Sequence, residues 1–311
     1  MNNKILIVGT GALAILFAAR LAQAGCSVIM LGTWKAALDS LYEHGARLVD
    51  EHGGEHPFAV EVTDNPRKCT GVRYALVLVK AWQTERAANQ LKECLAENGL
   101  AITLQNGIGN REILAQSLGG ERVALGVTTT GATLLGPGLV RAGGEGVISL
   151  ERNPVLGPIE AALRTANFQV EVVENAPSLV WGKLVINAAI NPLTALLRVP
   201  NGKLLEVPSA RRLMGALARE TARVAKAEEV ELPFLDPVSA AEDVARRTSA
   251  NRSSMLQDIL RGAPTEIDAI CGAVVEYAER HGIATPANWA CWKLVKATAN
   301  RNQGPHNSQT G

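Results

Sequence analysis

The feature that most constrains the fold is a glycine-rich turn at residues 9–14, GTGALA, which lies between an apolar run and an Ala- and Leu-rich stretch. The run Lys4–Val8 is typical of a buried parallel strand, and Ala12–Ala24 has helical spacing that ends at Gly25. A second, β-branched run, Ser27–Leu31, follows at once. A strand, a helix and a strand within about thirty residues predict a βαβ unit with a right-handed crossover.

The chemistry of this turn indicates a phosphate-binding loop. Gly9 allows the tight turn, and Gly11 lets the backbone approach a pyrophosphate at the helix N-terminus, where free N–H groups and the helix dipole favour anions. The third motif position, where Ala is tolerated, serves helix–strand packing. A plain Gly-rich turn in an unrelated α/β protein is the alternative. The residues predicted to bind a dinucleotide here are Gly9, Thr10, Gly11, Ala12, Leu13 and Ala14.

The end of the second strand indicates which dinucleotide is bound. An acidic residue about twenty positions beyond the turn would bind the ribose 2′-hydroxyl of NAD. No Asp or Glu occurs there before Asp39, whereas Thr33 and Lys35 could hold the 2′-phosphate of NADP. The sequence therefore favours NADPH/NADP. The alternative is that Lys35 is a solvated lysine in the first turn of the next helix.

Strand-like runs alternate with helical stretches up to residue 173 and nearly disappear after residue 175. The alternation predicts an α/β fold with an N-terminal, Rossmann-type doubly wound sheet, and the later helical patterns predict a C-terminal all-α domain. We assign residues 1–174 to an NADP-binding domain, 175–300 to an all-α substrate and catalytic domain, and 301–311 to a disordered tail. The further predicted strands are Tyr74–Val79, Leu100–Leu104, Val123–Val127, Val147–Leu150 and Phe168–Val173, and the predicted helices of the second domain are Ser209–Glu229, Pro237–Ala250, Thr265–His281 and Pro286–Asn300.

Composition limits the classes of partner. The 311 residues have a formal net charge of +1 and no block of Lys and Arg, which argues against nucleic-acid binding and against binding to an anionic membrane. The five cysteines include no C-x-x-C pair, as expected for reduced thiols in a cytoplasmic protein. The oligomeric state stays open, a homodimer included.

Two local patterns could suggest other kinds of site. Residues 1–25 have features of a secretory signal, but glycines interrupt the apolar run and the fold needs this segment as its first strand and helix. No other stretch is expected to be long and apolar enough to span a bilayer. His52 and His56 flank paired glycines, which favours a polar hairpin tip over a metal site, so no metal is expected.

Three polar residues in a mostly apolar stretch, Lys183, Asn187 and Asn191, are spaced four residues apart. They therefore share one face of a largely buried helix. A buried amine and two buried amides are costly unless they meet partners, and a polar ligand is one such partner. A polar network between helices is the alternative.

Other candidate residues come from their place in the predicted fold. Ligands of doubly wound sheets bind beyond the carboxyl ends of the strands, where Lys80, Asn106 and Ala132 are expected. In the helical domain Ser254 belongs to a polar cluster, and Glu266 lies twelve residues beyond it. Glu266 also fits the start of a helix, where an acidic residue complements the helix dipole, and this capping role is its alternative.

Taken together, the chain resembles the ketopantoate reductase (2-dehydropantoate 2-reductase) family. The matching segments span residues 4 to 300 in family order: GTGALA, VKAWQ, LQNGIG, the run Lys183–Asn191 with NPLTAL, SSMLQDI, TEIDAI and HGIATP. The chain departs from the family pattern at Ala14, where glycine is commoner, and at Cys271, where many members have asparagine. The segment around Thr33 lacks an arginine that is often present there.

The resemblance implies a reduction of 2-dehydropantoate to (R)-pantoate by NADPH, in the pantothenate pathway. It implies that Lys183 donates the proton and that Glu266 lies near both the substrate and the nicotinamide. The substrate contacts that it implies are Asn106, Asn187, Asn191, Asn201 and Ser254, and the further cofactor contacts are Lys80, Asn106, Ala132 and Glu266.

Three other functions remain as alternatives. A reductase of another branched 2-keto acid would keep the chemistry and change the substrate. A non-catalytic NADP-binding sensor would bind the cofactor without turnover and would not need Lys183 together with Glu266. A dehydrogenase of the 6-phosphogluconate type is disfavoured, because no cluster of basic residues for a sugar phosphate accompanies the polar helix face.

Overall fold

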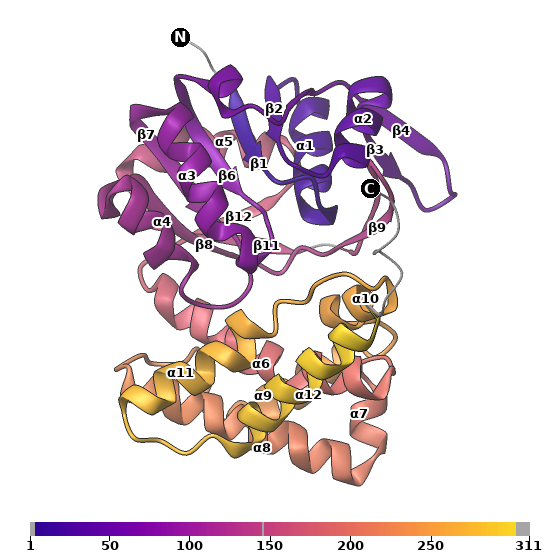
Figure 1. Ribbon diagram of the computed structural model, residues 1–311, viewed down its shortest axis with the longest axis vertical. Helices are drawn as coiled ribbons and strands as arrows, with labels where there is room; N and C mark the ends of the chain where they lie inside the picture. Colours follow the sequence, from indigo (N-terminus) through magenta and orange to yellow (C-terminus); the bar gives the residue numbers. More distant parts are fainter. Residues whose placement is uncertain (1–3, 145, 303–311) are drawn as a thin grey trace, which may run out of the picture. The chain divides into compact units, whose positions relative to one another are not determined.

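The computed structural model describes residues 4–144 and 146–302 and divides into two compact units (Figure 1). Within this range the first unit extends to Gln105 and continues over Asn110–Ala176, and the second comprises Asn106–Gly109 and the residues from Pro177 onward. The sequence placed a single boundary after residue 174. The loop Asn106–Gly109 precedes this boundary but belongs to the second unit, because its groups hydrogen-bond to residues 266–269 of that unit.

The first unit is built on an eight-stranded sheet with the order β12-β11-β8-β7-β6-β1-β2-β5. Neighbouring strands are parallel, except for the antiparallel pair β8 and β11. This arrangement confirms the doubly wound sheet predicted from the sequence. The strands are β1 (Ile5–Val8), β2 (Val28–Leu31), β5 (Glu61–Thr63), β6 (Val72–Val77), β7 (Leu95–Thr103), β8 (Val123–Thr128), β11 (Val147–Glu151) and β12 (Gln169–Val173).

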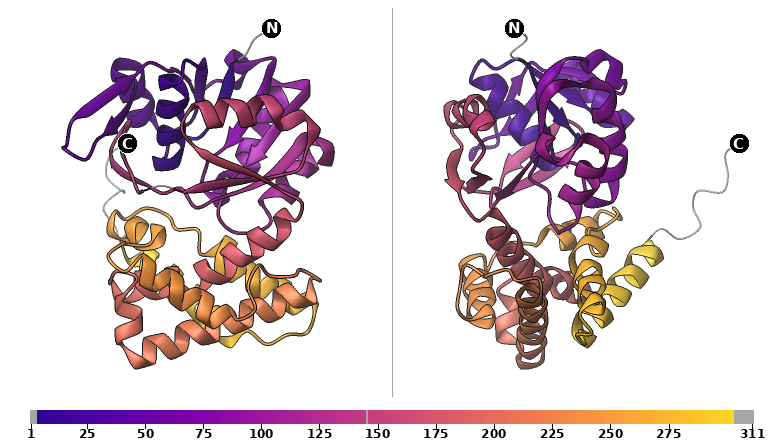
Figure 2. Two further views of the ribbon diagram at one scale, coloured as in Figure 1. Left: turned by 180° about the vertical axis from the view of Figure 1, so that it is seen from behind. Right: turned by 90° about the vertical axis from the view of Figure 1, so that its left-hand side faces the viewer.

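Helices cover both faces of this sheet (Figure 2). They are α1 (Ala12–Gln23), α2 (Lys35–His44), α3 (Thr84–Cys94), α4 (Asn110–Leu118) and α5 (Gly157–Thr165), with the 3₁₀ turns η1 (Pro66–Cys69), η2 (Ala81–Gln83), η3 (Gly120–Arg122) and η4 (Pro154–Leu156). Successive residues of β1 face opposite sides, so Ile7 packs in the core around α1 and α5, whereas Leu6 packs in the core around α3 and α4. Both faces of the strands are therefore buried, which explains their continuous apolar runs.

A second sheet, of four strands, was not predicted from the sequence. Its order is β4-β3-β10-β9, with β3 and β10 parallel and the two outer pairs antiparallel. It packs against α1, whose residues from Ala14 to Ala19 are fully buried as a result. A helix enclosed on all sides is apolar on all sides, as the sequence of α1 is. The strands are β3 (Ala46–Val49), β4 (Glu55–Phe58), β9 (Ala132–Gly136) and β10 (Leu139–Ala142).

The turn between β3 and β4 is the hairpin tip predicted from the paired glycines. Asp50 organises it, since its carboxylate accepts the backbone N–H groups of His52 and Gly54 at 2.8 Å each. Nε2 of His56 lies 2.7 Å from the same carboxylate. Residues 4–144 and 146–302 include no group of three His, Cys, Asp or Glu side chains that could hold a metal ion.

The described part of the second unit consists of helices and loops, which confirms the predicted all-α domain. Its core forms around α6, where Val185, Ala188 and Ala189 are fully buried. The helices are α6 (Ala176–Leu197), α7 (Lys203–Glu206), α8 (Pro208–Ala227), α9 (Pro237–Arg247), α10 (Ser254–Leu260), the π-helix η5 (Asp268–Gly272), α11 (Ala273–Arg280) and α12 (Pro286–Asn302).

Two helices of this unit differ from their predicted forms. The expected helix Thr265–His281 is divided into the π-helix η5 and α11, because a wider turn precedes the regular helix. The last helix, α12, continues to Asn302, into the predicted tail. Residues 303–311 of that tail lie outside the described residues.

One helix has the length and composition of a membrane span. The sequence-based expectation was that no segment after residues 1–25 is long and apolar enough. This helix is α6, and 67% of its most apolar 18-residue window is buried inside the protein. Because α6 also carries Lys183 and two asparagines on one face, its apolar character is that of a core helix.

Candidate functional site

The glycine turn between β1 and α1 has the geometry of a phosphate cradle. Gly9 has φ +131°, and a Cβ atom there would lie 3.0 Å from the backbone oxygen of Leu78. Gly11 is the N-cap of α1 and receives no side-chain cap, and a Cβ atom on it would meet no heavy atom within 4 Å among the described residues. The N-terminus of α1 thus has open space beside backbone N–H groups that lack a side-chain cap, which fits the pyrophosphate of a dinucleotide.

The end of β2 lies close to the side chain of Thr10 in this cradle. Thr10 is buried, and a Cβ atom on Gly32 would lie 2.5 Å from its Cγ2 atom. Glycine at position 32 therefore lets the end of β2 approach the loop. Ala14 is fully buried, which agrees with its predicted packing role.

The other predicted cofactor residues lie at several places in the first unit. Thr33 and Lys35 are exposed after β2, and Nζ of Lys35 lies 3.4 Å from a carboxylate oxygen of Asp39. Lys80 follows β6, the parallel neighbour of β1, and its backbone N–H donates to Oε1 of Gln83 at 3.3 Å. Ala132 begins β9 in the second sheet and packs against the core around α1.

The polar face of α6 lies in the second unit. Lys183 and Asn187 are half-buried, and Asn191 is 7% exposed. The helix is assigned without interruption from Ala176 to Leu197, so the spacing of four residues aligns the three side chains along one face. From Lys183 to Asn191 this face is about 12 Å long at 1.5 Å per residue.

At one end of this face Lys183 is held near a buried carboxylate. Burial lowers the pKa of Lys183 from 10.5 to about 8, and the negative charge of Glu266 acts in the opposite direction and raises it. Glu266 is 6% exposed and accepts a hydrogen bond from Nδ2 of Asn106 at 3.0 Å. An ammonium group with a pKa near neutrality can give up its proton to a reacting oxygen.

Toward the other end of the face, the loop after α6 is held against residues 248–251. The backbone N–H of Asn201 donates to the carbonyl oxygen of Asn251 at 3.0 Å, and its Nδ2 donates to Oγ1 of Thr248 at 2.9 Å. Oδ1 of Asn201 is buried and has no hydrogen-bond donor among the residues that the structure describes. A buried acceptor left unpaired costs about 1–3 kcal/mol, so this oxygen favours a ligand that brings a donor.

The buried serine of this region is the neighbour of the predicted one. Ser254 is exposed at the first position of α10. Ser253 is buried, accepts the N–H of Leu256 at 3.1 Å and lies 2.7 Å from the hydroxyl of Thr194 on α6. A serine before an apolar helical run is an N-cap signal, and that signal could have identified Ser253 from the sequence.

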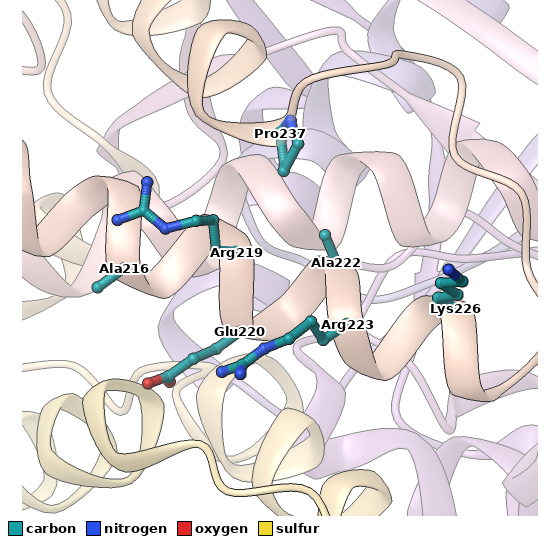
Figure 3. Close-up of a pocket in the computed structure, with 7 residues that line it drawn as sticks. All are labelled: Ala216, Arg219, Glu220, Ala222, Arg223, Lys226 and Pro237. Atoms are coloured by element: carbon teal, nitrogen blue, oxygen red, sulfur yellow. The ribbon is translucent and has the colours of Figure 1, made fainter.

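A separate groove of about 470 Å³ runs along α8, and no predicted site residue lines it (Figure 3). Arg219, Arg223 and Lys226 are exposed around it, and Glu220 is buried beside them. Glu220 is engaged in the fold, because its carboxylate accepts the N–H groups at the start of α12. No basic cluster is evident in the sequence, since these cations are spread over eight residues and come together on the helix surface through helical spacing.

Comparison with known proteins gives matches to both units. The family model described as "Ketopantoate reductase PanE/ApbA" matches residues 5–154. The model described as "Ketopantoate reductase PanE/ApbA C terminal" matches residues 175–299. The two matches include the cradle at the start of α1 and the polar face of α6.

Individual relatives match over nearly the whole chain. A 2-dehydropantoate 2-reductase of Halobacterium salinarum is 35% identical over 94% of this chain and 98% of its own length. The crystal structure of a PanE/ApbA family ketopantoate reductase from Ralstonia eutropha has a TM-score of 0.90 at 31% identity and covers 96% of this chain and 99% of that one. D-mandelate dehydrogenase in a ternary structure with NADH and anilino(oxo)acetate also has a TM-score of 0.90, at 25% identity and the same coverage.

Proposed function

The chain belongs to the ketopantoate reductase family, and from this membership we propose that it reduces 2-dehydropantoate to (R)-pantoate with NADPH, as in pantothenate biosynthesis. The observation that carries the proposal is Lys183, whose pKa of about 8 suits a proton donor, together with Glu266 and its hydrogen bond to Asn106. In this proposal residues 1–174 bind the cofactor, and residues 175–300 bind the substrate and supply the proton. A cytoplasmic location belongs to the same proposal and is supported by the five free cysteine thiols.

The proposed chemistry assigns a separate role to each group. NADPH, when bound, supplies the hydride that adds to the ketone carbon. Negative charge then develops on the ketone oxygen, and the ammonium of Lys183 stabilises that charge and gives its proton to this oxygen. Glu266 favours the charged form of Lys183, and Asn106 holds the carboxylate of Glu266 by its hydrogen bond. Asn187, Asn191, Asn201 and Ser254 are the proposed substrate contacts.

The residues at the start of α1 hold the cofactor in this proposal. The backbone of Gly9–Ala14 binds the pyrophosphate, and Thr33 and Lys35 bind the 2′-phosphate. Lys80, Asn106, Ala132 and Glu266 are the remaining proposed cofactor contacts. The open space beside Gly11 supports the first assignment, and the exposure of Lys35 supports the second.

Lys35→Ala is expected to raise KM for NADPH about tenfold and to leave KM for NADH unchanged, since a hydrogen bond to a charged group is lost with NADPH alone. Asp39→Ala is the matched control, because it removes the carboxylate that faces Lys35 and leaves the ammonium in place. Its KM for NADPH should be unchanged or lower. Equal changes in KM for the two cofactors in Lys35→Ala would remove Lys35 from the 2′-phosphate site.

The substrate itself is tested by a panel of 2-keto acids, each assayed with NADPH and with NADH. Since Oδ1 of Asn201 is an unpaired buried acceptor, we expect it to accept the hydroxyl of 2-dehydropantoate. The kcat/KM for 2-dehydropantoate should exceed that for 2-ketoisovalerate, which lacks the hydroxymethyl group that carries this hydroxyl, by at least about tenfold. In Asn201→Ala this ratio should approach one. The rate with 2-ketoisovalerate serves as the internal control for folding, and equal wild-type rates would exclude 2-dehydropantoate as the preferred substrate.

A reductase of another 2-keto acid is the second candidate function. The observation that favours it is the similarity to D-mandelate dehydrogenase, a protein whose name points to a different 2-hydroxy acid. The same panel, extended to phenylglyoxylate, separates the two candidates by the ratio of their kcat/KM values.

A further inference from the structure

The π-helix η5 redirects a backbone carbonyl. In an α-helix the N–H of Ala273 would donate to the carbonyl oxygen of Ala269. Here that N–H donates to the carbonyl oxygens of Asp268 and Ile270. The oxygen of Ala269 instead accepts the N–H of Ile108 at 3.3 Å. The wide turn therefore provides an acceptor for a loop that is distant in sequence.

The residue before Ile108 has a backbone that fits closely against this acceptor. Gly107 has φ +83°, and a Cβ atom on it would lie 2.4 Å from the oxygen of Ala269. Glycine is thus required both by the backbone angle and by the contact. The residue before it, Asn106, donates to Glu266 at 3.0 Å. Three consecutive residues of the loop therefore dock on residues 266–269.

The opposite side of η5 is anchored to α12. One carboxylate oxygen of Asp268 accepts Nε1 of Trp292 at 2.6 Å and Nζ of Lys296 at 2.8 Å. The indole of Trp292 also lies against Gly272, where a Cβ atom would come within 3.0 Å of the ring. The π-helix, which begins two residues after Glu266, is therefore held by α12 as well as by the loop.

We infer that η5 is a positioning element for the reaction, and that Gly107 acts as a positioning residue by docking the loop so that Asn106 holds the carboxylate of Glu266. The inference rests on the proposed function, since it concerns how Glu266 is directed toward Lys183. The π register supplies the Ala269 carbonyl, Gly107 allows the loop to reach it, and the Trp292 contact prevents the turn from shifting away from the loop.

The chain contains a matched control for this test. Gly109 lies in the same loop and has φ +90°, but a Cβ atom on it would meet no heavy atom within 4 Å among the described residues. Gly107→Ala and Gly109→Ala therefore carry similar backbone strain, and Gly107→Ala alone collides with Ala269. We expect kcat to fall at least tenfold further in Gly107→Ala than in Gly109→Ala. The alkaline limb of the kcat/KM profile should move to lower pH in Gly107→Ala, and it should stay in place in Gly109→Ala.

A double-mutant cycle tests whether Gly107 acts through Glu266. In a Glu266→Gln background the further loss caused by Gly107→Ala should shrink to less than threefold. A full tenfold loss in that background, or equal losses in the two glycine variants, would overturn the inference. If Gly107→Ala does not fold, Trp292→Phe serves in its place, because it removes the hydrogen bond of the indole to Asp268. Its kcat should be at least threefold lower than that of the wild type. In the Glu266→Gln background, adding Trp292→Phe should leave kcat unchanged.

Hydrogen exchange separates this inference from the proposed function. The amide of Ile108 should be protected in the wild type and in Gly109→Ala, and should exchange at least tenfold faster in Gly107→Ala. If the wild type reduces no 2-keto acid, the proposed function fails while the exchange rates still decide whether the loop docks. An unprotected Ile108 amide in an active wild type refutes the docking alone.

Discussion

Lys183→Ala is expected to lower kcat for 2-keto acid reduction at least about 100-fold, the usual scale of a lost general acid. The variant lacks both the proton donor and the positive charge that stabilises the developing alkoxide. Affinity for NADPH should remain within about twofold of the wild type, because the phosphate cradle consists of the backbone at the start of α1. A non-catalytic sensor would instead bind NADPH without turnover even in the wild type.

The measurement is steady-state kinetics with 2-dehydropantoate, combined with NADPH binding followed by fluorescence. Lys203→Ala is the matched control, since it removes an exposed lysine from the same unit, where Nζ lies 2.7 Å from Glu206. Its kcat should equal that of the wild type. If Lys183→Ala kept the wild-type kcat, Lys183 would not be the proton donor.

Thermal unfolding separates loss of chemistry from loss of fold. The pKa of Lys183 is about 8 in the folded protein and 10.5 when unperturbed, so the unfolded state holds more protons between these values. The free energy of unfolding attributable to this group therefore rises as the pH increases from 8 toward 10.5. Lys183→Met keeps the apolar stem and removes the charge, so its Tm at pH 7 should match or exceed that of the wild type. Inactivity with an undiminished Tm would identify a functional loss.

Glu266→Gln is expected to move the alkaline limb of the kcat/KM profile to lower pH by about one unit or more. Reduction requires protonated Lys183, so the wild-type rate should fall as the pH rises through about 8. Glu266 raises the pKa of Lys183, and removal of its charge lowers that pKa further. The fraction of protonated Lys183 at pH 8 falls accordingly, and kcat/KM at that pH should drop about fivefold or more.

The experiment compares pH profiles from pH 5.5 to 9.5 under conditions in which both proteins remain folded. Glutamine keeps an acceptor oxygen for Asn106, so the loop contact can persist while the charge is lost. Glu276→Gln is the control, because it removes a carboxylate that pairs with Arg280 on the surface of α11. Its profile should overlay that of the wild type. An alkaline limb that is unchanged in Glu266→Gln would show that Glu266 does not set the charge of Lys183.

The first sheet could be predicted because its signals are local. The strands of the eight-stranded sheet are buried on both faces, so apolar runs separated by helical stretches mark them in the sequence. The four-stranded sheet lacks such signals. Strand β4 is the polar segment Glu55–Phe58 and contains Pro57, and β9 and β10 are joined through Pro137 and Gly138. These strands are stabilised by packing against the apolar surface of α1, and such tertiary contacts leave no local pattern in the sequence.

Part of the candidate site could be predicted, namely the part in which helical spacing alone determines which side chains share a face. The spacing of four between Lys183, Asn187 and Asn191 places them on one face of any regular helix. The contact between Asn106 and Glu266, 160 residues apart, depends on how a loop docks, and no local pattern encodes it. The π-helix was not predicted for a related reason, because the carbonyl oxygen of Ala269 is held by the N–H of Ile108, a residue distant in sequence.

The enclosure of α1 by the second sheet has an entropic consequence for cofactor binding. Helix ends in proteins commonly fray. Where a loop becomes ordered only when its ligand binds, the entropy lost in that ordering lowers the affinity for the ligand. With Ala14 to Ala19 fully buried, the first turns of α1 are fixed before any anion arrives. The backbone N–H groups of the cradle are therefore preorganised, and their interaction with a pyrophosphate contributes to affinity with little loss to ordering. The second sheet contributes Ala132, at the start of β9, to the proposed cofactor contacts. Its remaining residues act on cofactor affinity indirectly, by fixing α1.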